Sequence, residues 1–216
     1  MISSSLKKRF VTSIILLFLI YFMFRYDFVL IFSLIILGIG SVLEFFAISK
    51  KILKHRFYLF VINLSFTLYI SIFCMTFFLF SNFLYLKIII FSILFACIAS
   101  DIGGFVFGKI FKGKKLTKLS PNKTISGAIG SVLFSFIIFS LLIYFFTNKL
   151  GYEIITIGIF ISIFCQGGDL FFSYLKRKAK LKDTGKILPG HGGILDRVDG
   201  ILLGVPFGFL SMSIFF

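Results

Sequence analysis

Long apolar stretches are the feature of this chain that most restricts how it can fold. Seven can be drawn, at 10–24, 27–48, 57–80, 84–108, 124–147, 152–175 and 198–216. Most of them reach or approach the roughly 20 residues that an α-helix needs to cross a bilayer. The first is short, and the third could contain a break, which would give eight spans. We predict an all-α, polytopic integral membrane helical bundle of about seven spans.

Composition supports the membrane class. Apolar residues make up 59% of the sequence, and charged residues make up only 14%. Soluble domains average roughly 45–50% apolar and about 25% charged residues. The spans exclude a soluble nucleic-acid-binding role, although the sequence pI is about 9.9.

The N-terminus resembles the first two regions of a signal peptide. A basic cluster at Lys7, Lys8 and Arg9 precedes the first apolar stretch. No small-residue cleavage site follows, because Arg25 and Asp27 interrupt the sequence and a second apolar stretch begins. We therefore expect an uncleaved first span.

Positive charge is concentrated in alternate connections between the spans. The N-terminus and the segments 50–56, 109–123 and 176–197 carry 3, 4, 6 and 7 Lys/Arg, which is 20 of the 23 in the chain. With seven spans, these segments all lie on one face, and the positive-inside rule makes that face cytoplasmic. The net charge of +15 is then one-sided. Topology and attraction to anionic lipid explain part of it.

The three cysteines give no sign of a metal site or a disulfide. Cys74, Cys97 and Cys165 all lie inside apolar stretches, without CxxC or Cys/His spacing. We expect buried, inert thiols, which excludes a disulfide scaffold or a zinc site.

Four aspartates stand out among the eight acidic residues. Asp101, Asp169, Asp196 and Asp199 each adjoin a glycine-rich stretch or lie where a span meets the cytoplasm. Converging carboxylates near a bilayer need cations. A divalent metal would satisfy them and leave positions for phosphate oxygens, and salt bridges to the many lysines are the alternative. Glu44, near the inner end of the second span, could pair with a cation or line a cavity.

Helical periodicity relates some of these carboxylates to the basic segment. If the sixth span continues as a helix, several residues share a face with Asp169, namely Phe172, Ser173, Lys176 and Lys180. Glycines at 167 and 168 would let a backbone or a ligand approach closely. Asp196 and Asp199 share a face if the last helix begins near Leu195. Two helix ends could then bring carboxylates together above a basic floor.

Glycine and lysine alternate in the segment that follows Asp101. Backbone N–H groups and lysine charge suit phosphate, whereas a solvated loop that sets topology is the alternative. This is not a P-loop, because Lys114 is followed by Lys115 rather than by Ser or Thr. A second glycine-rich turn surrounds His191, which is either structural or packed against a substrate.

Glycines 200, 204 and 208 repeat every four residues along the last span. Small residues at this spacing allow close helix contact, either within the chain or across a dimer. A similar stripe of small residues on the fifth span, at 127, 131 and 135, has the same explanation.

Three segments together resemble the phosphatidate cytidylyltransferases, also called CDP-diacylglycerol synthases. The most specific is the pattern S-x-x-K-R-x4-K-D-x-G-x2-L-P-G-H-G-G-x2-D-R-x-D. The chain meets it at Ser173, Lys176, Arg177, Lys182, Asp183, Gly185, Leu188 to Gly193, Asp196, Arg197 and Asp199. Residues 166–170 match the family's Q-x-G-D-L, and residues 101–124 are similar to its D-x-G-A-Y…G-K-x-L…S-P-N-K-T segment. These motifs cover roughly the second half of the chain.

The resemblance implies an enzyme of phospholipid biosynthesis that converts CTP and phosphatidate into CDP-diacylglycerol and pyrophosphate. The family uses Mg²⁺, and its metal-binding aspartates match Asp169 and Asp196. The implied catalytic residues are Asp169, Asp196, Lys176, Arg197 and Asp199. The implied substrate-binding residues are Asp101, Ser120, Lys123, Ser173, Arg177, Lys182, His191, Gly192 and Gly193.

This reaction suits the residues present. The lipid phosphate is already an anionic nucleophile, so no strong general base is needed. The enzyme must align it with the α-phosphorus of CTP and neutralise the leaving pyrophosphate, which metal and Lys/Arg can do.

The chain departs from the family pattern at four positions. Phe172 stands where the family usually has Glu, and Ile125 and Ser126 stand where it has Trp and Glu. Gly200 replaces a serine. The loss of two carboxylates could weaken a secondary metal or alter substrate preference.

These observations lead to one expected organisation. We expect a single integral membrane domain over 1–216, with N-terminal spans in 1–100 and a catalytic half in 101–216 whose site loops are 109–123 and 176–197. The expected location is the cytoplasmic membrane, with the site facing the cytoplasm. The expected partners are CTP, phosphatidate and membrane lipid, without nucleic acid, and a homodimer is an open possibility.

Two other functions remain open from the sequence. A related CTP-dependent enzyme could act on an isoprenoid ether lipid or be a lipid kinase. A transporter or channel would also place acids and glycine-broken helices inside the membrane.

Overall fold

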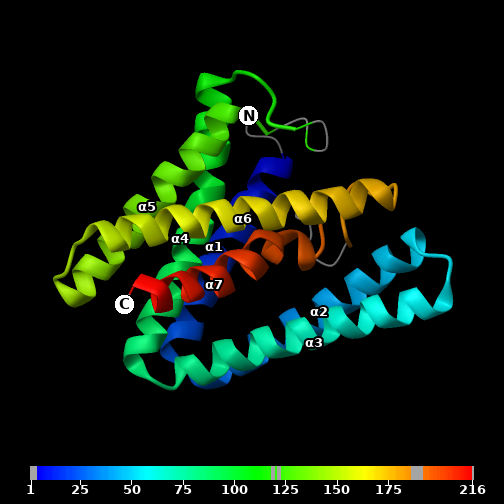
Figure 1. Cartoon of the computed structure of the whole chain (residues 1–216), viewed down its shortest axis with the longest axis horizontal. Helices are drawn as coiled ribbons and strands as arrows, with labels where there is room; N and C mark the ends of the chain where they lie inside the picture. The colour runs from blue at the N-terminus through cyan, green and yellow to red at the C-terminus, as the bar shows by residue number, and fades with distance from the viewer. Residues whose placement is uncertain (1–3, 118–119, 121–122, 186–191, 216) are drawn as a thin grey trace. The chain divides into compact units, whose positions relative to one another are not determined.

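The computed structural model describes residues 4–117, 120, 123–185 and 192–215, and over these ranges the chain is helical, without a β-strand (Figure 1). The helices are α1 (Ser4–Arg25), α2 (Asp27–Ile52), α3 (Arg56–Ser81), α4 (Leu84–Phe111), α5 (Ile125–Thr147), α6 (Tyr152–Lys178) and α7 (Leu195–Phe215). An isolated β-bridge between Lys115 and Thr124 lies in the connection from α4 to α5.

The helices match the apolar stretches and confirm the all-α membrane class. Six of them, α2 to α7, are long and apolar enough to cross a bilayer, and α1 contributes a shorter apolar part, Ile14–Arg25. The third stretch is one continuous helix, so the break that would have given eight spans does not occur there. The number of crossings and the side on which the N-terminus lies stay predictions.

The chain forms two compact units that interleave in sequence. The first contains Met1–Asn82 and Lys176–Arg197, and the second contains Phe83–Leu175 and Val198–Phe216. The basic segment that follows α6 therefore belongs with the N-terminal helices. In consequence, the candidate residues are divided between the two units.

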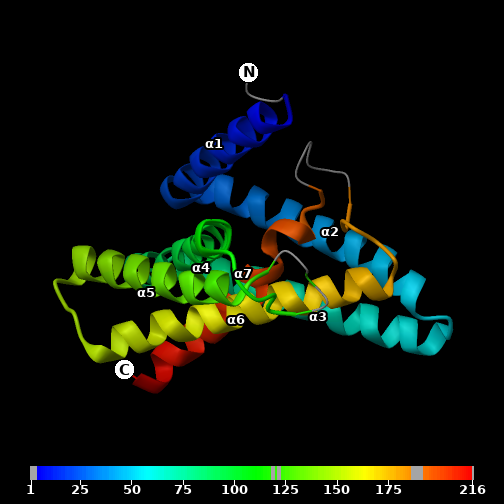
Figure 2. The same ribbon diagram turned by 90° about the horizontal axis from the view of Figure 1, so that it is seen from above.

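In the first unit, α2 and α3 run side by side in opposite directions (Figure 2). The Phe45 ring stacks on the Phe66 ring with their centroids 3.8 Å apart. Nearby, the Ser49 hydroxyl donates to Asn63 Oδ1 at 2.6 Å, which satisfies a buried polar group inside the helix pair. The pair is thus held by both apolar packing and a hydrogen bond.

In the second unit, glycines bring α4 and α5 into backbone contact. A Cβ atom at Gly103 would overlap the carbonyl oxygen of Gly130, and one at Gly127 would lie 2.8 Å from the carbonyl oxygen of Gly104. Only glycine permits this spacing at these positions. Of the glycines after Asp101, Gly103, Gly104 and Gly108 therefore lie within α4 and serve helix packing, whereas Gly113 lies in the connection that follows, with φ of 110°.

Small residues also join α4, α6 and α7. A Cβ atom at Gly204 would lie 2.5 Å from Cys97 Sγ, and one at Gly208 would lie 2.7 Å from Ile161 Cγ1. The glycine stripe of the last span thus packs within the chain. The cysteines are free thiols; Cys97 and Cys165 are fully buried, as expected, whereas Cys74 is only partly buried.

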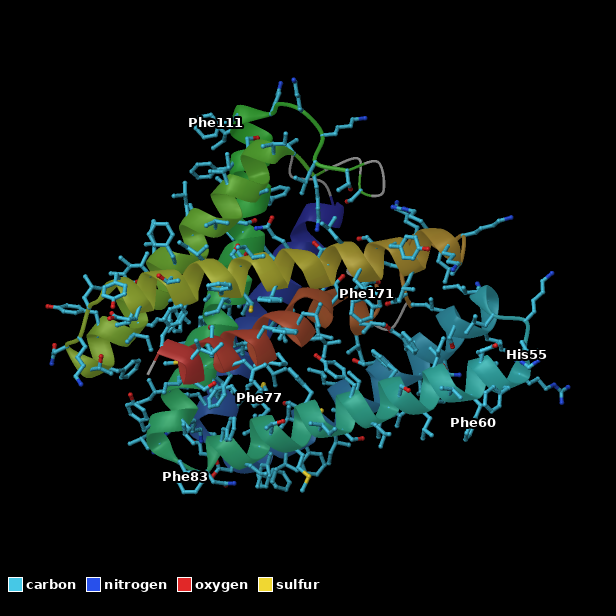
Figure 3. All side chains as sticks on the ribbon, viewed as in Figure 1. His55, Phe60, Phe77, Phe83, Phe111 and Phe171 are labelled. Carbon is cyan, nitrogen blue, oxygen red and sulfur yellow. The ribbon has the colours of Figure 1, made fainter. Side chains whose placement is uncertain are left out.

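Large apolar side chains cover the outside of the helices. Phe60, Phe83 and Phe111 point outward (Figure 3) and are 66%, 64% and 63% exposed, whereas Phe77 is 4% exposed. In water such surfaces would associate, but lipid solvates them. Their exposure fits helices that stand in a bilayer.

We predict that Gly103→Ala destabilises the protein and that Gly167→Ala does not. A methyl group at position 103 would overlap the carbonyl oxygen of Gly130, whereas nothing lies within 4 Å of a Cβ atom at position 167. Overpacking in Gly103→Ala should lower the free energy of unfolding by about 1–3 kcal/mol. In Gly167→Ala, the better helix propensity of alanine should raise the free energy of unfolding by roughly 0.5–1 kcal/mol. Unfolding midpoints in detergent measure both, and equal midpoints for the two variants would contradict the close α4–α5 contact.

Candidate functional site

Asp196, in the first turn of α7, is held by hydrogen bonds on both of its carboxylate oxygens. Oδ2 accepts from the backbone N–H of Thr184 at 2.8 Å and from that of Gly193 at 3.0 Å. Oδ1 accepts from Lys176 Nζ at 2.7 Å. The two side chains of this ion pair are 6% and 11% exposed. Asp196 and Lys176 therefore form a fixed, desolvated pair in the first unit.

The end of α6 explains why the chain turns back toward Asp196. Lys180 adopts a left-handed conformation with φ of 56°. Its N–H donates to the Arg177 carbonyl, and the Leu181 N–H donates to the Lys176 carbonyl. These are the two bonds of a Schellman motif, which normally has glycine at this position. The expectation that Lys180 continues the helical face of Asp169 is wrong, because α6 ends at Lys178.

Asp169, on α6, forms a second cluster within the second unit. Its Oδ2 pairs with Lys123 Nζ. Its Oδ1 accepts a long hydrogen bond of 3.4 Å from Ser173, one helical turn later. Both Asp169 and Lys123 are partly exposed, with side-chain exposures of 29% and 26%. This pair is therefore more accessible than the pair formed by Asp196 and Lys176.

Backbone bonds around the start of α5 fix the position of Lys123. The Leu116 N–H donates to the Lys123 carbonyl at 2.8 Å, and the Lys123 N–H donates to the Ser120 carbonyl at 3.1 Å. The next residue, Thr124, caps α5 by accepting from the Gly127 N–H at 3.1 Å. These backbone bonds and the cap at the next residue hold the Lys123 backbone in place.

Gly168 and Gly200 bring the backbones of α6 and α7 together beside Asp169. A Cβ atom at Gly168 would lie 2.5 Å from the Asp199 carbonyl oxygen, and one at Gly200 would lie 2.7 Å from Cys165 Sγ. Of the two alternatives for Gly168, the structure shows close approach of another backbone. The same close packing explains why glycine replaces the family's serine at position 200, since a serine side chain there would need Cys165 to move.

The other candidate residues are distributed as follows. Arg177, Lys182 and Arg197 are exposed in the first unit, where Gly192 and Gly193 adjoin Asp196. In the second unit, Asp101 is exposed on α4, Ser120 is half-buried and Asp199 is buried. His191 lies outside the described residues. The structure thus joins Asp196 with Lys176, and Asp169 with Lys123 and Ser173; the pairing of Asp169 with Asp196 stays a prediction.

Three residues that differ from the family pattern, Phe172, Ser126 and Ile125, have different surroundings in the structure. Phe172, which replaces the usual Glu, is 3% exposed and so contributes apolar packing. The Ser126 hydroxyl donates to the Lys112 carbonyl and lies 3.0 Å from the Thr124 hydroxyl. Ile125 is exposed at the start of α5.

One residue of the first unit was not recognised as part of this arrangement. Glu44, on α2, accepts hydrogen bonds from the Thr184 hydroxyl and from the N–H groups of Ile194 and Leu195. The sequence left a cation partner or a cavity as the alternatives for this carboxylate. Its donors are two backbone amides and a hydroxyl, which no spacing in the sequence indicates.

The carboxylates fit Mg²⁺ by donor type. Among the described residues, no group of three or more His, Cys, Asp or Glu side chains is placed to hold a metal ion. Mg²⁺ does not require one, because it is commonly bound by one or two carboxylates together with water and substrate phosphates. At Asp169 and at Asp196, a lysine ammonium group already lies against one carboxylate oxygen. Each aspartate therefore offers an oxygen that accommodates a cation.

Comparison with known proteins identifies the family. The chain is similar to the phosphatidate cytidylyltransferase of Rickettsia felis, with 42% identity over 125 residues that cover 52% of this chain and 54% of the relative. It is also similar to the protein of that name from Helicobacter pylori strain J99, with 42% identity over 127 residues that cover 56% of this chain and 44% of the relative. The Bacillus subtilis strain 168 protein of that name is 38% identical over 128 residues, 57% of this chain and 48% of the relative. The chain spans about half the length of these curated relatives. The model of the cytidylyltransferase family matches residues 3–215, and the chain therefore belongs to this family.

Proposed function

We propose that the protein is a phosphatidate cytidylyltransferase, which makes CDP-diacylglycerol and pyrophosphate from phosphatidate and CTP. The observation that carries the proposal is the Asp196–Lys176 pair, which backbone N–H groups hold inside the basic segment. Similarity to relatives of that name supports the choice of substrates.

The proposed reaction is a substitution at phosphorus. An oxygen of the phosphatidate phosphate forms a bond to the α-phosphorus of CTP, and the bond from that phosphorus to the bridging oxygen of pyrophosphate breaks. The nucleophile is already anionic, so the side chains mainly align two polyanions and offset their charge. Lys176 and the exposed cations Arg177, Lys182 and Arg197 suit this task in the first unit, and Lys123 suits it in the second.

We further propose that Asp169, in the second unit, and Asp196, in the first, are each Mg²⁺ ligands. When bound, the ion would neutralise charge on the CTP phosphates and on the leaving pyrophosphate. Thr184 and Gly193 keep Asp196 oriented, and Ser173 contacts Asp169. Asp101 and Asp199 have supporting roles in this proposal, and His191, Gly192 and Gly193 shape the nucleotide pocket. The site faces the cytoplasm, because the basic segments predict that side.

A related enzyme that uses CTP on another lipid acceptor is the second candidate. The same phosphate and metal chemistry would serve an isoprenoid ether lipid, and Phe172, Ile125 and Ser126 change positions at which the family pattern has other residues. An assay with labelled CTP, Mg²⁺ and a panel of lipid acceptors separates the two candidates. Absence of a CDP-lipid with every acceptor would refute both.

We predict that Asp169→Asn and Asp196→Asn each lower turnover about 10²- to 10³-fold or more, because each removes charge that the phosphates and metal require. Labelled CDP-diacylglycerol formed by detergent-purified protein measures the effect. Glu153→Gln is the matched control, since Glu153 lies on α6 about 24 Å along the helix from Asp169. Wild-type turnover in either Asn variant would remove that aspartate from the mechanism.

We also predict that activity depends on a divalent cation. EDTA should abolish CDP-diacylglycerol formation, and Mg²⁺ added in excess should restore it, because water and lysine alone cannot replace a divalent ion on the triphosphate. The unfolding midpoint should change little on chelation, since hydrogen bonds and ion pairs hold both aspartates without metal. Full turnover in EDTA would exclude Mg²⁺ from the proposed mechanism.

A further inference from the structure

We infer that Glu44 is a positioning residue that holds the segment carrying Lys176 and Asp196 in its working arrangement. Glu44 lies on α2, in the half of the chain without catalytic motifs. This role rests on the proposed function. All the contacts that carry it lie within the first unit.

The Glu44 carboxylate is buried and accepts three hydrogen bonds. Glu44 is 5% exposed. Oε2 accepts from the Thr184 hydroxyl at 2.6 Å and from the Leu195 N–H at 2.9 Å, and Oε1 accepts from the Ile194 N–H at 2.9 Å. A buried carboxylate is costly unless such donors satisfy it. The carboxylate and its donors therefore fix one another.

Glu44 acts as a cap for α7 supplied by another helix. The first N–H groups of an α-helix have no partner inside the helix. The N–H groups of Ile194 and Leu195, at the start of α7, are bound by Glu44 instead. A negative charge at this end also interacts favourably with the helix dipole. Glu44 thus determines where α7 begins, immediately before Asp196.

The donors of Glu44 are interwoven with those of Asp196. Thr184 donates its hydroxyl to Glu44 and its N–H to Asp196 Oδ2. Gly193 donates its N–H to Asp196 and lies so close to Glu44 that a Cβ atom would overlap Oε2. Loss of the Glu44 carboxylate would release Thr184 and Gly193, and with them the orientation of Asp196.

Two motif glycines are explained by the position of Glu44. A Cβ atom at Gly185 would overlap Glu44 Oε1 and lie 2.9 Å from its Cδ, and Gly193 is equally crowded. Neither glycine has a positive φ, unlike Gly192 at 82°. Space around the carboxylate, and not backbone conformation, therefore requires glycine at 185 and 193.

The first test is Glu44→Gln, assayed with CTP, phosphatidate and Mg²⁺ in detergent. Glutamine fills nearly the same space, but its NH₂ group must face an N–H or O–H donor. We expect turnover to fall roughly 10- to 100-fold, as for loss of a hydrogen bond to a charged group. The Mg²⁺ concentration for half-maximal activity should rise, because Asp196 is no longer oriented. Glu153→Gln, the matched control, should keep wild-type values.

The second measurement does not depend on activity. Lys182 is exposed in the segment that Glu44 holds. In Glu44→Gln, trypsin should cleave within 176–197 at least about tenfold faster than in wild type, with fragments identified by mass. Cleavage elsewhere should be unchanged. A variant that fails to fold would instead lose resistance throughout the chain.

Two milder variants keep the inference testable if Glu44→Gln does not fold. Thr184→Val removes one of the three donors and should lower turnover by a smaller factor, about 3- to 10-fold. Gly185→Ala should impair the enzyme when Glu44 is present. In a Glu44→Ala background it should cause little further loss, because the atoms that its methyl group overlaps are gone.

The outcomes separate this inference from the proposed function. If the wild-type protein makes no CDP-lipid, the proposed function fails, and the trypsin measurement still tests whether Glu44 holds the segment. If the wild type is active and Glu44→Gln matches it in turnover, Mg²⁺ dependence and trypsin resistance, Glu44 has no positioning role. Additive losses from Gly185→Ala and Glu44→Ala would likewise overturn the inference.

Discussion

The need to pair buried backbone groups at the start of α7 is the constraint on which the first unit depends. A helix that begins in a water-poor region must find partners for its first N–H groups within the protein. Here Glu44 binds those of Ile194 and Leu195, and Asp196 binds that of Gly193. Two carboxylates thus fold the basic segment against α2 and the first turn of α7. The same bonds orient a residue proposed to act on substrate.

Glycine has different tasks in the motifs of this family, and packing accounts for most of those that the structure describes. Gly103 and Gly127 let α4 and α5 meet at the backbone, and Gly168 lets α7 cross α6 beside Asp169. Gly193 makes room for a carboxylate. Gly113, with φ of 110°, and Gly192, with φ of 82°, are the cases in which glycine suits the backbone conformation itself. A glycine-rich motif near a phosphate site therefore need not consist of phosphate-binding loops.

Hydropathy predicted the helices well, because a bilayer requires long apolar segments whatever their neighbours are. The last apolar stretch was drawn from 198, and a start near Leu195 was the condition for Asp196 and Asp199 to share a face; α7 does begin at Leu195. The end of α6 did not follow from the sequence. A lysine in left-handed conformation closes that helix, and lysine carries no sequence signature of a C-cap. Glu44 was missed for a related reason, since its donors lie 140 to 151 positions away and two of them are backbone amides. The partner of Asp169, Lys123, was likewise identified as a phosphate ligand and not as an ion-pair partner.

The two aspartates matched to metal ligands use their oxygens in a similar way, each within its own unit. At Asp196, Oδ2 is held by backbone N–H groups and Oδ1 faces the Lys176 ammonium; at Asp169, Oδ1 accepts from Ser173 and Oδ2 faces Lys123. One oxygen thus fixes the side chain while the other contacts a lysine ammonium group. Because the lysine contacts the oxygen that the orienting bonds do not hold, a cation that replaced it would leave those bonds in place. A carboxylate held by lysine on both oxygens would lack this property, since any exchange would also release its orientation.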